Sequence, residues 1–100
     1  MRTGAYPRAV SVGSGLPGQA LVLRGLSDLE VGRESVEALL VSIGAPRLES
    51  LGFRVPPPIP APEHRLYALL AAEEPDSAHS RYNALVRRLV SFERAAACAS

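Results

Sequence analysis

A chain of 100 residues, of which 47% are apolar, is long enough for one domain and too apolar to be wholly disordered. A formal net charge of +1 excludes a strong basic field over the whole surface, and the absence of lysine excludes lysine-dependent phosphate loops and Schiff-base chemistry. A single cysteine excludes an intramolecular disulfide; with no signal peptide and no apolar run of membrane-spanning length, a cytoplasmic location is expected.

The first two predicted segments are an arm and a helix. Residues 1–16 mix Gly, Ser, Pro and Arg with little periodicity, which indicates a flexible arm. A helix is expected over residues 17–30, although Gly25 weakens it by about 1 kcal/mol relative to Ala. Residues 20–23 also fit a short buried strand, and periodicity alone leaves both alternatives open. Four apolar residues recur every third position and are expected to form the buried stripe of the helix: Ala20, Leu23, Leu26 and Leu29.

The next helix has the clearest pattern in the first half of the chain. Glu34 and Glu37 are expected in its first turns, where acidic side chains favour the positive end of the helix dipole. Gly44 fits the position after the last turn, which favours a left-handed backbone. Four apolar residues have the i, i+3, i+4, i+7 spacing of one helix face: Val36, Leu39, Leu40 and Ile43.

A short helix and a proline-rich connector follow. The short helix is expected to begin near Pro46, to turn Leu48 and Leu51 inward and to stop at Gly52. Five of the nine prolines lie in residues 56–62, which excludes a helix or a central strand there. The connector is interpreted as a semi-rigid polyproline II spacer, with a ligand for an aromatic groove of another protein as the alternative.

Two helices are expected in the second half. The first covers residues 62–74 and ends before Pro75. The last helix is capped by Asp76 or Ser77, is the longest, and is expected to fray over residues 95–100. Its apolar residues keep helical spacing over about five turns: Ala78, Tyr82, Leu85, Val86, Leu89, Phe92 and Ala96.

The predicted fold is therefore all-α, a small four- to five-helix domain with a flexible N-terminal arm and a Pro-rich connector. The arm covers residues 1–16, the first helical region 17–55, the connector 56–62 and the second helical region 63–100. All of these parts are expected to form one compact domain.

Catalytic and metal-binding patterns are weak throughout. Asp76 and His79 have an i, i+3 spacing, but one such pair falls short of the several inward carboxylates and Glu-x-x-His motifs of a di-metal bundle. Cys98 lies in an Ala-rich tail with no neighbouring His in the sequence, whereas a catalytic thiol needs a positive, ordered pocket. We therefore expect no enzyme activity, no catalytic residue, no metal site and no cofactor.

Nucleic-acid binding is the main alternative function. Residues 43–47 join two helices by a tight turn similar to a helix-turn-helix, and Arg47 lies just after that turn. The arm carries Arg2 and Arg8, which would suit insertion into a minor groove. These three arginines would bind DNA if the chain were a small DNA-binding regulator.

The last helix carries the features that favour a protein partner. Tyr82, Arg87, Arg88 and Phe92 are residue types enriched at protein interfaces, because each combines apolar area with specific geometry or a polar group. The apolar stripes of residues 36–43 and 82–96 also look larger than so short a chain can cover by itself. We therefore expect a noncatalytic interaction module, either a dimerising adaptor or a neutralising partner similar to an antitoxin, in a homo-oligomer or a small hetero-complex.

Overall fold

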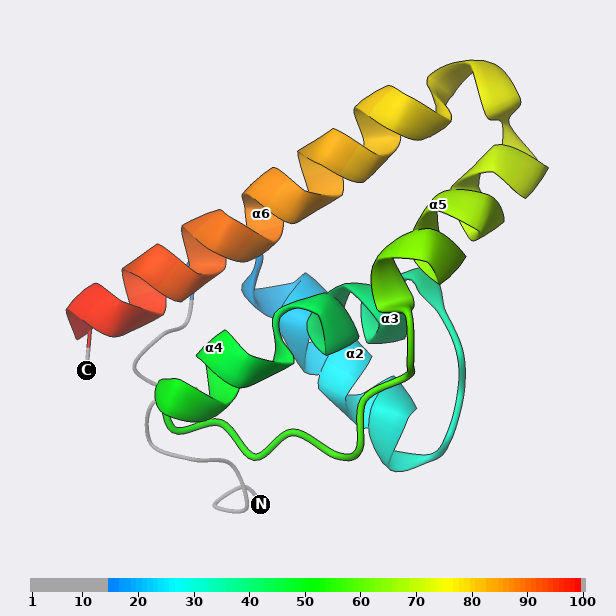
Figure 1. The fold of residues 1–100 in the computed structure, drawn as a ribbon. Coiled ribbons are helices and arrows are strands. Elements are labelled where there is room, and N and C mark those ends of the chain that lie inside the picture. The colour runs from blue at the N-terminus through cyan, green and yellow to red at the C-terminus, as the bar shows by residue number, and fades with distance from the viewer. Residues whose placement is uncertain (1–14, 100) are drawn as a thin grey trace.

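The computed structural model describes residues 15–99 as helices packed around one core, with the longest helix lying across the others (Figure 1). No strand occurs within these residues, so the all-α prediction is confirmed and residues 20–23 are helical. Residues 1–14 of the predicted arm lie outside the described range. In chain order the elements are α2 (Gln19–Glu30), α3 (Val36–Ile43), α4 (Ala45–Ser50), α5 (Pro62–Glu73), the 3-10 turn η1 (Pro75–Ser77) and α6 (Ala78–Ala99).

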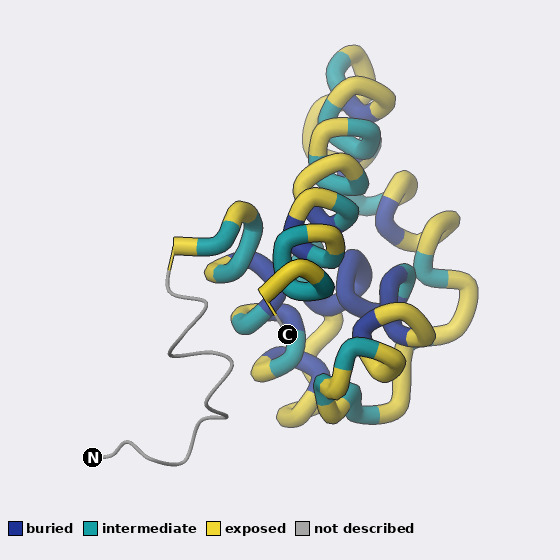
Figure 2. Tube along the Cα trace, turned by 90° about the vertical axis from the view of Figure 1, so that its left-hand side faces the viewer, coloured by how far each residue is buried: buried dark blue, intermediate teal, exposed yellow. Residues whose placement is uncertain are grey.

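Helix α3 is the centre of the fold. It packs against α2, α5 and α6, and its middle residues, 38–42, are buried. Figure 2 shows the buried residues, in dark blue, gathered in the middle of the molecule. The expectation that its apolar stripe is too large for the chain to cover is therefore wrong, because three other helices cover it from different sides. Within residues 15–99, only Val31 and Tyr67 are exposed large apolar side chains, at 67% and 42%.

The α2–α3 connection is held by a buried carboxylate and a helix cap that the sequence analysis did not identify. Ser35 is the N-cap of α3, and its hydroxyl oxygen accepts a hydrogen bond of 3.0 Å from the Ala38 N–H. The same hydroxyl donates to Asp28 Oδ2 at 2.6 Å, and the Asp28 side chain also pairs with Arg33 at 3.5 Å. Of the two predicted acids, Glu37 lies in the first turn, whereas Glu34 precedes the helix.

Substitution of Ser35 by Ala tests this connection. We expect a loss of about 2 kcal/mol in the free energy of unfolding, because the cap is removed and the buried Asp28 carboxylate loses a donor. Urea unfolding measures the loss. Ser50→Ala is the control, since the Ser50 hydroxyl is exposed and bonds only to the nearby Arg47 carbonyl; it should cost less than about 0.5 kcal/mol. Equal effects of the two substitutions would contradict the assigned role of Ser35.

The buried face of α2 differs from the predicted stripe. Ala20 is exposed and Leu23 and Leu26 are only half-buried, so of the four predicted residues only Leu29 is buried. A step of three residues turns a helix by about 300°, so the three steps from Ala20 to Leu29 drift away from one face. The buried residues of α2 are instead Leu21, Val22, Gly25, Asp28 and Leu29.

Gly25 is required by the close approach of α2 to α3. A Cβ atom at this position would overlap the Glu37 carbonyl oxygen and a methyl group of Val41, both on α3. The start of α2 also depends on a glycine. Gly18 has φ +75°, a left-handed conformation, so the helix begins at Gln19 rather than at the predicted Pro17.

The two glycines that flank α4 differ in role. Gly52 has φ +101° and follows the helix, as predicted. The left-handed conformation predicted for Gly44 is wrong, since its φ is −90°. Its lack of a side chain instead makes room for α6, because a Cβ atom would lie 3.0 Å from a Leu89 methyl and 2.8 Å from a Glu93 carboxylate oxygen.

Helix α5 takes in the last proline of the predicted connector, Pro62, and residues 51–61 between α4 and α5 contain no helix or strand. This segment lies against the core through Val55 and Ile59. The Ile59 N–H donates a hydrogen bond of 3.0 Å to the hydroxyl of Ser42, a buried residue of α3. That hydroxyl in turn donates to the Ala38 carbonyl at 2.9 Å. The connector is thus tied to the central helix.

The second half of the chain follows the predicted pattern closely. Helix α5 ends at Glu73, because Glu74 is extended before Pro75. All seven apolar residues predicted to face inward on α6 belong to the core or pack against it. The predicted cap is replaced by the η1 turn, in which the Ser77 hydroxyl donates back to Glu74. Fraying from residue 95 is wrong, since α6 continues to Ala99.

Candidate interaction surface

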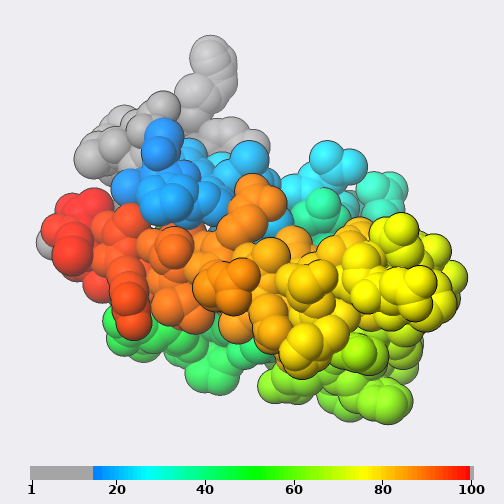
Figure 3. Space-filling view, turned by 90° about the horizontal axis from the view of Figure 1, so that it is seen from above, coloured from blue at the N-terminus to red at the C-terminus, as the bar shows by residue number. Residues whose placement is uncertain are grey.

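One exposed face of α6 separates two hollows in the protein surface. It consists of Ala84, Arg87, Arg88 and Ser91, which have the i, i+3, i+4, i+7 spacing of a single helix face and are all exposed. We name these four residues the α6 ridge. Figure 3 shows α6 in orange and red running along this side of the molecule, with the blue start of α2 beside it.

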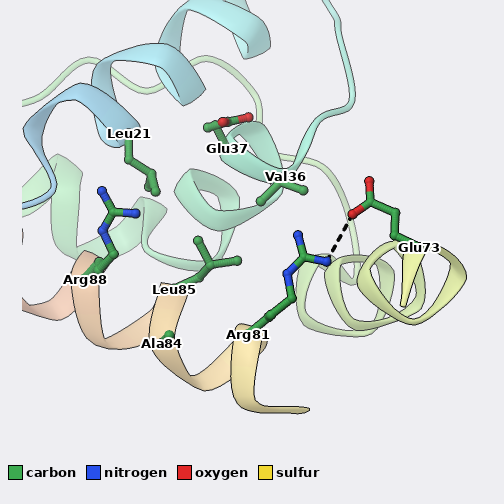
Figure 4. Close-up of a pocket in the computed structure, with 8 residues that line it drawn as sticks. All are labelled: Leu21, Val36, Glu37, Glu73, Arg81, Ala84, Leu85 and Arg88. Atoms are coloured by element: carbon green, nitrogen blue, oxygen red, sulfur yellow. Dashed lines mark hydrogen bonds and ion pairs between the residues drawn. The ribbon is translucent and has the colours of Figure 1, made fainter. Parts of the chain in front are cut away.

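The first hollow lies where α6 faces α2, α3 and α5 and has a volume of about 460 Å³. Leu85 projects from α6 between Arg81 and Arg88, with Leu21 of α2 and Val36 of α3 on the opposite side (Figure 4). Its floor is therefore aliphatic and its rim is charged. The lining residues are Leu21, Val36, Glu37, Glu73, Arg81, Ala84, Leu85 and Arg88.

The second hollow lies on the other side of the ridge, against the start of α2, and has a volume of about 450 Å³. The α6 backbone and α2 meet closely there: a Cβ atom at Gly18 would lie 2.8 Å from the Arg88 carbonyl oxygen. No acidic residue lines this hollow. The lining residues are Pro17, Gly18, Ala84, Arg87, Arg88 and Ser91.

The arginines around these hollows differ in their partners. Arg81 forms an ion pair of 3.2 Å with Glu73. Neither the Arg87 nor the Arg88 side chain forms a hydrogen bond or ion pair with any residue in the range 15–99. Two adjacent guanidinium groups are thus exposed on the ridge with all their donors available.

The four residues predicted to contact a partner do not form one surface. Arg87 and Arg88 lie together on the ridge. Tyr82 packs against Tyr67 of α5, with the ring centroids 5.9 Å apart, and burial followed by the nearby Glu63 charge raises the pKa of its hydroxyl. Phe92 is 2% exposed and packs against Phe53 at 5.6 Å, so its ring belongs to the core.

The residues of the DNA-binding alternative are only partly described. Arg2 and Arg8 lie outside residues 15–99. Arg47 is exposed on α4, where its charge acts on the Glu93 carboxylate of α6. Helix α4 has six residues, and the preceding helix of the predicted helix-turn-helix is the buried α3.

The Glu93 carboxyl makes the stability of the folded chain depend on pH. Burial raises the pKa of this carboxyl above its ordinary 4.5, and the Arg47 cation opposes that shift. Because the folded chain disfavours the charged form, the resulting destabilisation is absent below pH 4.5 and develops as the pH rises through the folded-state pKa.

Glu93→Gln should therefore make the protein more stable than the wild type at pH 7, with a difference that shrinks towards zero below about pH 4.5. Thermal unfolding across this pH range measures it. Glu49→Gln on the exposed face of α4 is the control and should show no such trend. The prediction is contradicted if the stability of Glu93→Gln, measured relative to the wild type at the same pH, is lower at pH 7 than at pH 4.

Side chains that could take part in catalysis or bind a metal are dispersed in the described part of the structure. His79 hydrogen-bonds to Asn83 at 3.2 Å on the exposed side of α6, and Cys98 is an exposed thiol near its end. Within residues 15–99, no group of three or more His, Cys, Asp and Glu side chains has the arrangement needed to hold a metal ion.

Several residues of the two hollows escaped sequence reasoning. Ala84 and Ser91 are small residues on the outer face of α6, whereas Leu21 lies on α2 and Gly18 directly precedes that helix. The i, i+3, i+4, i+7 spacing of the ridge residues was the only available signal for a shared face. The hollows themselves depend on how α2 meets α6, which no local pattern specifies.

Comparison with known protein families, curated proteins and solved structures found no match to this chain.

Within residues 15–99, no helix combines the length and apolar character that crossing a bilayer requires.

Proposed function

We propose that this chain is a noncatalytic protein-interaction module that contacts its partner through the α6 ridge. The observation that carries the proposal is that two hollows lie beside two exposed arginines whose side chains have no partner within residues 15–99. Arg88 lines both hollows, and Arg87 lines the second. Arginine is enriched at interface hot spots, and concave apolar surface beside it receives side chains of a partner.

The apolar stripe of α3 gives this proposal no support, since α3 is buried within the chain. The proposal depends on the ridge, where apolar side chains at the floor of the first hollow lie next to exposed cations. This combination is typical of an interface with an apolar centre and a polar rim. The dispersed His, Cys and carboxylate groups favour binding over catalysis.

The test is the size of the complex that the chain forms in its native cell. We expect the wild type to migrate well above its own 10.6 kDa. Arg88→Glu should reduce the recovered complex at least about tenfold, because a charge is reversed at the centre of the surface. Arg94→Glu is the matched control, since Arg94 is exposed on the same helix and lines neither hollow.

Two outcomes would overturn the proposal. One is a wild-type chain that migrates as a monomer at its native concentration. The other is equal loss or equal retention of the complex in Arg88→Glu and Arg94→Glu. Matched melting curves for the two variants separate loss of binding from loss of folding.

A further inference from the structure

We infer that the α6 ridge binds an acidic, amphipathic helical segment of a partner protein, with an apolar residue in the first hollow and a carboxylate on Arg88. This inference rests on the proposed interaction function and specifies the chemistry of the partner. It also gives the segment a direction along α6.

The first step is the cost of covering Arg87 and Arg88. A partner that covers the ridge removes both guanidinium groups from water, and an unpaired buried charge is strongly unfavourable. No carboxylate of this chain lies on the second hollow or pairs with either side chain within residues 15–99. The partner must therefore supply the anion, and a carboxylate matches the planar donor geometry of arginine.

The second step is the aliphatic floor beside Arg88. Leu85 lies three residues before Arg88, about 4.5 Å back along the helix axis, and faces Leu21 and Val36 across the first hollow (Figure 4). An apolar side chain of the partner fits this floor. On a partner helix, residues three or four apart also share one face, so one apolar and one acidic side chain can face Leu85 and Arg88 together.

The third step concerns the charges along the first hollow. They orient the partner segment along α6 and disfavour binding of a polyanion. Glu37 lies across the first hollow from Leu85, between Leu21 and Val36, and Glu73 borders the Arg81 end (Figure 4). At that end Arg81 is already paired with Glu73, whereas Arg88 at the other end has no ion-pair partner within residues 15–99. Phosphates spaced evenly along a nucleic acid would meet these carboxylates, so a segment with acid at one end and an apolar residue at the other fits better.

The experiment uses two fluorescein-labelled, alanine-based helical peptides of about 18 residues, long enough to be partly helical in isolation. The first has Leu and Glu four residues apart, and the second has Gln in place of that Glu. Fluorescence anisotropy with the full chain should show at least about tenfold tighter binding of the Glu peptide. Arg88→Gln should abolish this preference, whereas Arg94→Gln should retain it.

The inference is overturned if the wild type binds both peptides equally, or neither, or if both arginine variants lose the preference. Displacement of the Glu peptide by a short DNA duplex would assign the arginines to phosphate and would also overturn it. So would concentration-dependent self-association of the chain that Arg88→Gln weakens, since a second copy would then occupy the ridge. If the native complex depends on Arg88 while the peptides fail, the interaction function stands and this inference falls.

Discussion

Replacing Gly25 by Ala should lower the free energy of unfolding by about 3 kcal/mol, towards the upper end of the effects of overpacking in a core. The added methyl group would overlap the Glu37 carbonyl oxygen, and its distance to the Glu37 carbonyl carbon would be 2.9 Å. Because the obstacle is backbone, it cannot rotate away, and α2 must separate from α3. The gain of about 1 kcal/mol in helix propensity offsets only part of this cost.

Denaturant unfolding measures the Gly25→Ala effect, and Gly44→Ala is the matched control. The Gly44 Cβ would meet the ends of the Leu89 and Glu93 side chains, which can shift. We expect Gly44→Ala to cost less than about 1 kcal/mol, within the usual range for a core that can adjust. A Gly25→Ala protein as stable as the wild type would contradict the close crossing of α2 and α3.

Phe92→Ala should have the largest effect, a loss of about 3–5 kcal/mol in the free energy of unfolding, as is typical of truncating a buried phenylalanine. The ring is 2% exposed and packs on Phe53, so its removal leaves a cavity next to the core. This loss is large against the total stability of about 5–15 kcal/mol for a domain of this size. Thermal unfolding of the isolated chain measures it.

Two further variants make the Phe92 result decisive. Phe92→Leu keeps most of the volume and should cost about 1.5 kcal/mol, which leaves a folded protein for comparison. Val31→Ala, at a side chain that is 67% exposed, should change stability by less than about 0.5 kcal/mol. If Phe92→Ala leaves the isolated chain as stable as the wild type, the ring is available to a partner and the sequence-based assignment was right.

Local rules account for the elements that the sequence predicted well. Pro75 ends α5 because the residue before a proline avoids the helical region, and Gly52 follows α4 with the left-handed backbone that favours glycine. The apolar stripe of α6 is long enough for its period to be unambiguous.

Tertiary contacts account for the errors. In α2 the buried face is set by the contact of Gly25 with α3, which overrides the three-residue spacing of Ala20 and Leu23. At Gly44 the glycine leaves room for the Leu89 and Glu93 side chains of α6 and does not form a left-handed turn. Neither contact joins neighbours in the sequence, so no local pattern could have predicted it.

The candidate surface was predicted only in part for the same reason. Arg87 and Arg88 were identified from residue type and from their place on the longest helix. Tyr82 and Phe92 were grouped with them, but the structure turns these rings towards α5 and the core. The hollows on either side of Arg88 are formed by four helices and the residues just before α2, so they become visible only in the folded chain.

The most direct test of the α6 ridge is photo-crosslinking from Ala84, the small exposed residue that lines both hollows. A benzophenone amino acid is placed at Ala84, or at the exposed Ala72 of α5 as the control, in the chain expressed in its native cell. We expect crosslinks from position 84 to another polypeptide, lost in Arg88→Glu, and none from position 72. Equal crosslinking from both positions, or only intrachain products from position 84, would contradict the ridge as the contact surface.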